Sequence, residues 1–217
     1  IDGMLKDGNI VVTTAASHNS VLRPLFRARD LRECEVRIVG VAPDGSLDMD
    51  SFARAAQGAS VVAVTHASNL TGDVYDVAQQ ARIAHEAGAL FILDAAQTAG
   101  SIPMNMAELG ADVLCFTGHK GLLGPQGTGG LCLAKDIEIP PLIEGGSGTH
   151  SFDERHPLAM PESLEAGTVN AHGIAGLAAG IAYIQQQGVS TITQHEAALA
   201  NKVAEGLATM DSIRILG

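Results

Sequence analysis

The 217-residue chain is poor in aromatic residues and cysteine, and it has no long apolar run. Aromatic residues make up 3% of it, and Trp is absent. Its three cysteines (Cys34, Cys115 and Cys132) are odd in number and widely spaced. This excludes a disulfide scaffold or a Cys-rich zinc site and indicates a reducing, cytoplasmic setting. No apolar run approaches the roughly 18 residues of a membrane span, and the first residues lack the pattern of a signal peptide.

Positive charge is also scarce. Thirteen Lys and Arg stand against 24 Asp and Glu, which gives a formal net charge of −11. Nucleic acids and anionic membranes attract cationic surfaces, so this balance disfavours both as partners.

Glycine is the residue in excess, with 25 copies. Short apolar segments rich in β-branched residues alternate with helical patterns, and several are apolar at successive positions, as is typical of strands covered on both faces. We therefore predict an α/β fold with a mainly parallel sheet and helices on both faces. The predicted strands are 9–15, 36–40, 60–66, 89–94, 112–117 and 129–134. The predicted helices are 19–28, 49–57, 77–87, a short one at 105–109, 174–187 and 192–210.

Two further segments stand out. Residues 144–171 are irregular, polar and rich in Gly, Pro, Ser and His, which predicts a long functional loop. The chain begins with Ile1, and residues 212–217 have the pattern of a strand start. We therefore expect a piece of a longer protein.

The common glycine-rich phosphate motifs do not fit. The segment 127–132 fails G-x-G-x-x-G at its last position and precedes a strand, and no G-x-x-x-x-G-K-[ST] exists. The segment 145–149 lacks the closing glycine of a nucleophile elbow. Dinucleotide binding, P-loop chemistry and serine hydrolysis are therefore disfavoured.

Ligands of parallel α/β sheets bind beyond the carboxyl ends of the strands. One of only four lysines, Lys120, lies there between two glycines, where partial desolvation would make its amine a nucleophile. An ordinary loop lysine fits this position equally well. Asp94 ends the apolar run ALFILD and could pair with a protonated pyridine nitrogen or merely cap the next helix. Together, Lys120 and Asp94 suggest a pyridoxal phosphate site.

Four segments then resemble one family in order and spacing. They read THASNLTGDVYDV, GALFILDAAQTAGSIPMNM, ADVLCFTGHKGLLGPQGTGGL and LEAGTVNAHGIAGL. The chain resembles the cysteine desulfurases, class V aminotransferase-like enzymes with the fold-type I pyridoxal phosphate architecture. The resemblance implies a three-layer large domain at 1–190 whose N-terminal part is missing. Residues 191–217 would lead towards a small C-terminal domain that is absent.

The resemblance also implies residue roles. Lys120 would form the Schiff base with pyridoxal 5'-phosphate, and Asp94 would bind its pyridinium nitrogen. His18 would stack on the ring and relay protons. The remaining implied cofactor contacts are Gln97 and Asn69 near the ring hydroxyl, Thr117 and His119 at the phosphate, and Thr168 at the phosphate of a neighbouring subunit. The last contact implies a homodimer, and Thr149 competes with Thr168 for it.

From the sequence alone, ordinary structural roles remain possible for several of these residues. His18 could cap a helix, Asn69 could form a turn with Gly72, and Thr117 and Thr168 could be ordinary strand and loop residues.

The resemblance places the catalytic cysteine and the substrate-binding arginine after Gly217, and none of the three cysteines present takes the catalytic role. The implied reaction converts L-cysteine to L-alanine and passes sulfur to that cysteine, and from there to a possible acceptor protein. Transamination, selenocysteine lysis and a catalytically silent dimerisation module are the alternatives.

Overall fold

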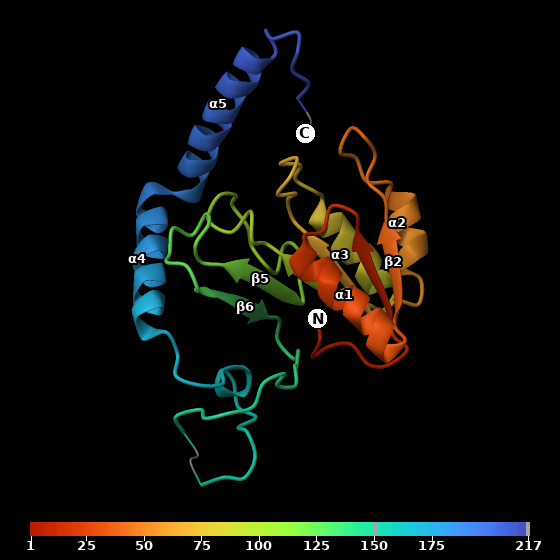
Figure 1. Ribbon diagram of the computed structural model, residues 1–217, viewed down its shortest axis with the longest axis vertical. Helices are drawn as coiled ribbons and strands as arrows, with labels where there is room; N and C mark the ends of the chain where they lie inside the picture. Colours follow the sequence, from red (N-terminus) through yellow and green to blue (C-terminus); the bar gives the residue numbers. More distant parts are fainter. Residues whose placement is uncertain (150–151, 216–217) are drawn as a thin grey trace.

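The computed structural model describes residues 1–149 and 152–215, and it contains a six-stranded sheet in the order β2-β1-β3-β4-β5-β6. Strands β1 to β5 are mutually parallel, and β6 runs antiparallel to β5 (Figure 1). The strands are β1 (Ile10–Thr14), β2 (Glu35–Val39), β3 (Val61–Thr65), β4 (Leu90–Asp94), β5 (Val113–Thr117) and β6 (Gly129–Leu133). The predicted α/β class with a mainly parallel sheet is confirmed.

Three helices, α2, α3 and α4, begin at an Asp or Asn side-chain cap. Asp48 accepts hydrogen bonds from the backbone of Asp50 and Ser51, Asp76 from Gln79, and Asn170 from Gly173. These caps satisfy backbone N–H groups that a first helical turn leaves unpaired. The helices are α1 (Asn19–Arg32), α2 (Met49–Ala56), α3 (Val77–Glu86), the 3-10 turn η1 (Glu162–Leu164), α4 (Ala171–Gln187) and α5 (Val189–Leu207).

Strand β3 is buried on both faces because its side chains alternate between two cores. Val62 and Val64 belong to one core, which includes residues of α2 and α3. Val61 and Ala63 belong to the other, which includes residues of α1. Successive side chains of a strand point to opposite faces, so the continuous apolar run VVAV fills both layers. The sheet is thus the middle of three layers.

Helix α4 packs closely on the loop between β5 and β6. A Cβ on Gly176 would press on the ring of Pro125, and one on Gly180 would meet backbone atoms of Leu122 and Leu123. The glycines therefore allow the close packing that the Gly- and Ala-rich sequence predicts. Helix α5 has no buried residue and projects from the body (Figure 1). No helix in the described part of the chain is long and apolar enough to span a membrane.

Two sequence predictions differ from the structure. The short helix predicted at 105–109 is wrong. Residues 106–110 form turns, because the one helix-type hydrogen bond, from Leu109 N–H to Asn105 O at 3.0 Å, is not followed by a second of the same spacing. The strand start predicted at 212–217 is not seen at 212–215, and residues 216–217 lie outside the described residues. The predicted loop 144–171 is irregular apart from η1 and the first residue of α4, and its residues 150 and 151 also lie outside the described part.

Candidate active site

Four parallel strands end side by side at one edge of the sheet. In the sheet, β1, β3, β4 and β5 are neighbours, and Thr65 pairs with Asp94, which in turn pairs with Cys115. The polar segments that follow these strands therefore emerge along one edge, where open parallel sheets bind their ligands. All the candidate residues except Thr149 and Thr168 come from these segments.

Asp94 is half-buried at the tip of β4. One carboxylate oxygen accepts a hydrogen bond from the backbone N–H of Ala96 at 3.0 Å. Within the described residues, no protein group bonds the second oxygen. A carboxylate held at the end of an apolar strand is costly to bury unless a cation or further donors complete its hydrogen bonding. The position can thus accept a cationic N–H group from a ligand.

Lys120 lies in a tight turn after β5. The turn closes through Gly124 N–H to Gly118 O at 2.7 Å and Leu123 N–H to Lys120 O at 2.9 Å. The Lys120 side chain is half-buried, and its ammonium has no hydrogen-bonding or ionic partner among the described residues. An amine without a salt bridge remains available for a ligand.

The turns that carry Asp94 and Lys120 interlock through glycine backbones. A Cβ on Gly100 would overlap the carbonyl of Gly121, and a Cβ on Gly121 would overlap Ala99 O and the Ser101 side chain. Gly100 also has φ +89°, which favours glycine. These two glycines let the turn after β4 contact the turn after β5, so they hold the Asp94 and Lys120 segments together.

The Gly100→Ala substitution should therefore destabilise the fold by roughly 3 kcal/mol or more, because the left-handed strain and the backbone overlap add. Urea denaturation measures this loss. Gly88→Ala is the matched control, since Gly88 has φ +78° and open space around the position of a Cβ. An equal loss in both variants would show that the overlap with Gly121 contributes nothing.

Thr117 and His119 flank the start of the same turn. The hydroxyl of Thr117 lies 2.8 Å from Nδ1 of His119, so the two predicted phosphate contacts form one hydrogen-bonded pair. Thr117 is half-buried and His119 is exposed. Gln97 lies half-buried in the turn after β4, three residues beyond Asp94.

His18 is the N-cap of α1, which is the capping alternative considered from the sequence. Its Nδ1 accepts the backbone N–H of Ser20 at 3.1 Å and lies 2.9 Å from the Ser20 hydroxyl. Because Nδ1 acts as an acceptor, the neutral ring carries its proton on Nε2. Capping thus fixes the ring and leaves Nε2 for a ligand, so the capping and catalytic roles are compatible.

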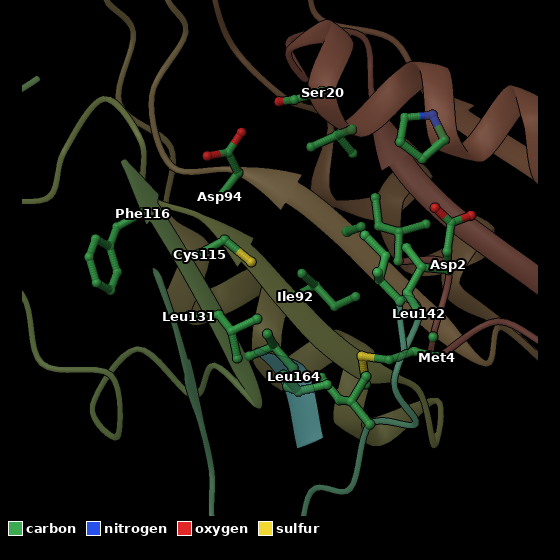
Figure 2. A pocket seen from close by; sticks show the side chains of 18 of the residues that line it. Asp2, Met4, Ser20, Ile92, Asp94, Cys115, Phe116, Leu131, Leu142 and Leu164 are labelled. Carbon is green, nitrogen blue, oxygen red and sulfur yellow. The ribbon is translucent and has the colours of Figure 1, made fainter. Parts of the chain in front are cut away.

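A pocket of about 740 Å³ opens on the sheet face beside Asp94. It is lined by Asp94, Thr117, Ser20 and Thr168 together with many apolar side chains. Figure 2 shows Asp94 and Ser20 at one end, and Leu131, Leu164 and Met4 at the other. Asp2 also lines the pocket, beside Leu142 in Figure 2, so the pocket is mainly apolar with polar side chains at the strand tips and at Asp2.

A second pocket of about 650 Å³ is lined by His18, Asn69 and Ser68, among others. The hydrogen bond between His18 and Ser20 joins the rims of the two pockets. Asn69 is exposed in the turn that Gly72 closes at φ +80°. The structure thus brings five predicted residues to two adjoining pockets. The others, Lys120, Gln97, His119 and the exposed Thr149, line neither pocket.

Neither Cys34 nor Cys115 lies in surroundings that favour a reactive cysteine. Cys34 is buried, and its Sγ donates to Lys6 O at 3.4 Å. Burial raises the pKa of Cys115, which lies on β5 in the wall of the first pocket. A thiol with a raised pKa is protonated at neutral pH and is a poor nucleophile. Cys132 is exposed on β6, outside both pockets.

Sequence reasoning gave His66 no role beyond the end of the predicted strand 60–66. His66 is buried, and its Nδ1 lies 2.9 Å from the hydroxyl of Thr98, which is also buried. The two residues are 32 positions apart, and no motif connects them. Only the pairing of β3 with β4 brings them together.

Burial lowers the pKa of His66 below its usual 6.5. The unfolded chain therefore takes up this proton first on acidification, so the histidine's contribution to stability is complete above about pH 6.5 and is lost as the pH falls towards the folded-state pKa. We expect urea denaturation at pH 7.5 and 5.5 to show a smaller acid-induced loss of unfolding free energy in His66→Asn than in wild type. Equal losses would contradict burial of a neutral imidazole.

Comparison with known proteins assigns the whole chain to one family. The family model described as aminotransferase class V matches residues 1–217. The chain therefore belongs to the class V aminotransferase family.

Within that family, the similar curated proteins are cysteine desulfurases. A probable cysteine desulfurase of Pyrococcus abyssi is 37% identical over 211 residues, which cover 95% of this chain and 53% of the relative. A probable cysteine desulfurase of Methanothermobacter thermautotrophicus is 36% identical over 98% of this chain and 54% of its own length. The chain thus spans about half the length of the curated relatives it matches.

The similar solved structures are also cysteine desulfurases. The apo cysteine desulfurase from Thermococcus onnurineus has a TM-score of 0.85 at 37% identity, covering 94% of this chain and 52% of that one. The cysteine desulfurase CsdA from Escherichia coli has a TM-score of 0.86 at 27% identity, covering the same shares. The chain is therefore cysteine desulfurase-like in sequence and in fold.

Proposed function

We propose that the protein containing this chain is a pyridoxal phosphate-dependent cysteine desulfurase, and that this chain supplies the residues that hold the cofactor. The proposal is carried by the interlocked turns at Gly100 and Gly121, which join the segment of Asp94 to the segment of Lys120. Family membership and the cysteine desulfurase relatives support this function.

The residues present fit this cofactor by their chemistry. Asp94 offers a carboxylate oxygen to a protonated ring nitrogen, and Lys120 offers to an aldehyde an amine that has no partner among the described residues. Thr117 and His119 offer a hydroxyl and an imidazole to a phosphate. We further propose Gln97 and Asn69 as hydrogen-bonding partners of the ring hydroxyl.

When bound, pyridoxal phosphate supplies an aldehyde for covalent attachment of amines and a ring that withdraws electrons from them. Asp94 would keep the ring nitrogen protonated through its negative charge. Lys120 would hold the cofactor and then, once released by the substrate amine, carry a proton on Nζ. His18, fixed by Ser20, would present Nε2 on the ring face and hold or move a second proton.

The sulfur acceptor within the enzyme would be a cysteine thiolate outside this chain. Cys34 is buried, the raised pKa of Cys115 keeps its thiol protonated at neutral pH, and Cys132 lies outside both pockets. We propose that the substrate is L-cysteine, that a further protein receives the sulfur, and that the enzyme is a cytoplasmic homodimer. In this proposal Thr168 contacts the phosphate held by the partner subunit. Residues 1–190 belong to the large domain, and residues 191–217 lead towards a smaller one.

Borohydride reduction tests the cofactor assignment. The intact protein is incubated with pyridoxal phosphate, reduced and digested, and the peptides are weighed by mass spectrometry. We expect the cofactor mass on the peptide that contains Lys120. Modification of another lysine, or of none, would overturn the role of Lys120.

The reaction is tested separately by supplying L-cysteine, L-selenocysteine or an amino donor with a 2-oxo acid. Release of alanine with sulfide or persulfide from L-cysteine supports desulfuration. Labelled Lys120 with turnover of only the other substrates would instead indicate another class V reaction.

A further inference from the structure

A buried polar pair connects the ends of two central strands outside the proposed cofactor contacts. His66, 6% exposed, directly follows β3, and Thr98, 1% exposed, lies in the turn after β4. Nδ1 of His66 and Oγ1 of Thr98 are 2.9 Å apart. This hydrogen bond pairs both side chains at a depth where an unpaired polar atom is costly, and the Thr98 hydroxyl also donates to Ala95 O at 3.5 Å.

Backbone hydrogen bonds extend this link to Asp94. The N–H of His66 donates to the carbonyl of Asp94 at 2.9 Å. The N–H of Thr98 donates to Ala95 O at 3.0 Å, and Ile102 N–H donates to Thr98 O at 2.9 Å. The turn from residue 95 to residue 102 is therefore folded around Thr98, and the Thr98 side chain ties it to β3.

The turn held in this way carries two of the proposed cofactor contacts. Asp94 lies at its start, and Gln97 immediately precedes Thr98 in the chain. Gly100 of the same turn contacts the turn of Lys120 through its backbone. Any movement of Thr98 would consequently displace Gln97 and loosen the contact with the Lys120 turn.

An uncharged histidine suits this anchoring role. Burial lowers the pKa of His66, so at neutral pH its imidazole takes part in the hydrogen bond without the cost of a buried charge.

We propose that His66 and Thr98 are positioning residues for the cofactor site: their hydrogen bond fixes the turn that carries Asp94 and Gln97. This inference rests on the proposed function, since it assigns the pair's effect to pyridoxal phosphate binding. Neither side chain needs to touch the cofactor.

The test compares Thr98→Val, which keeps the shape but removes the hydroxyl, with Thr98→Ser, which keeps the hydroxyl. In the intact apoprotein we expect pyridoxal phosphate to bind about ten-fold more weakly to Thr98→Val, equivalent to one net hydrogen bond. Binding to Thr98→Ser should stay within about two-fold of wild type.

His66 provides a second pair of variants. His66→Asn places an amide near the position of Nδ1 and should retain most of the wild-type affinity for pyridoxal phosphate. His66→Leu should lose it. The absorption maximum of the bound cofactor should shift in Thr98→Val and His66→Leu, because a displaced Asp94 changes the charge at the ring nitrogen. A purely structural role would leave this spectrum unchanged.

Hydrogen exchange separates this inference from the proposed function. We expect faster exchange at the amides of residues 95–102 in Thr98→Val, with unchanged protection in β3 and β4. Wild-type affinity, spectrum and exchange in Thr98→Val would overturn the inference. If wild-type protein binds no pyridoxal phosphate, the proposed function and the role in cofactor binding both fail, and exchange at 95–102 then reports only on whether the pair anchors the turn.

Discussion

In the intact protein, Lys120→Ala should abolish covalent cofactor binding and lower desulfuration by roughly 10³-fold or more. A positioned proton-transfer group alone contributes about 10²–10⁴-fold to a rate, and Lys120 is also the proposed attachment point. Steady-state release of alanine from L-cysteine measures the rate. The absorption spectrum, before and after borohydride treatment, measures the attachment.

Lys135→Ala is the matched control, because Lys135 is exposed beyond the end of β6. It should retain wild-type activity and the wild-type spectrum. Lys120→Arg adds a second comparison, since it preserves a positive charge without a primary amine and should be as inactive as Lys120→Ala. Substantial turnover by either Lys120 variant would contradict the proposed role of this residue.

The layered fold could be predicted because its signals are local. The run VVAV of β3 is apolar at successive positions because α1 covers one face of the sheet and α2 and α3 cover the other. Helices such as α3 begin at a capping aspartate that is visible in the sequence. The segment 105–109 looked helical, but only Leu109 N–H to Asn105 O has helical spacing, and the next bonds, from Gly110 to Ala107 and from Ala111 to Met106, close turns of other sizes.

The candidate site could be predicted only in part, because its supporting contacts join residues far apart in the chain. The positions of Lys120 and Asp94 after apolar strands pointed to the edge of the sheet. The interlock of Gly100 with Gly121 depends on the register of β4 against β5, and the pairing of His66 with Thr98 depends on β3 against β4. No local pattern specifies such contacts.

The second large effect is expected from Asp94→Asn. The amide keeps the size of the side chain and can still accept the hydrogen bond from Ala96 N–H, but it lacks the negative charge. Without that charge the ring nitrogen would lose its proton, and we expect kcat for desulfuration to fall by about 10²–10³-fold, the scale of losing one preorganised electrostatic contact. Cofactor affinity should fall as well.

The stability of Asp94→Asn distinguishes this reason from damage to the fold. Partial burial of a carboxylate that bonds only one backbone N–H destabilises the folded apoprotein. Removing its charge should therefore leave the Tm of the apoprotein unchanged or raise it. Asp136→Asn, an exposed position with φ +71° that asparagine tolerates, should change neither kcat nor affinity. A lowered Tm in apo Asp94→Asn would indicate that the charge stabilises the protein itself. Lost activity at an unchanged or higher Tm would indicate that the carboxylate is retained for the cofactor.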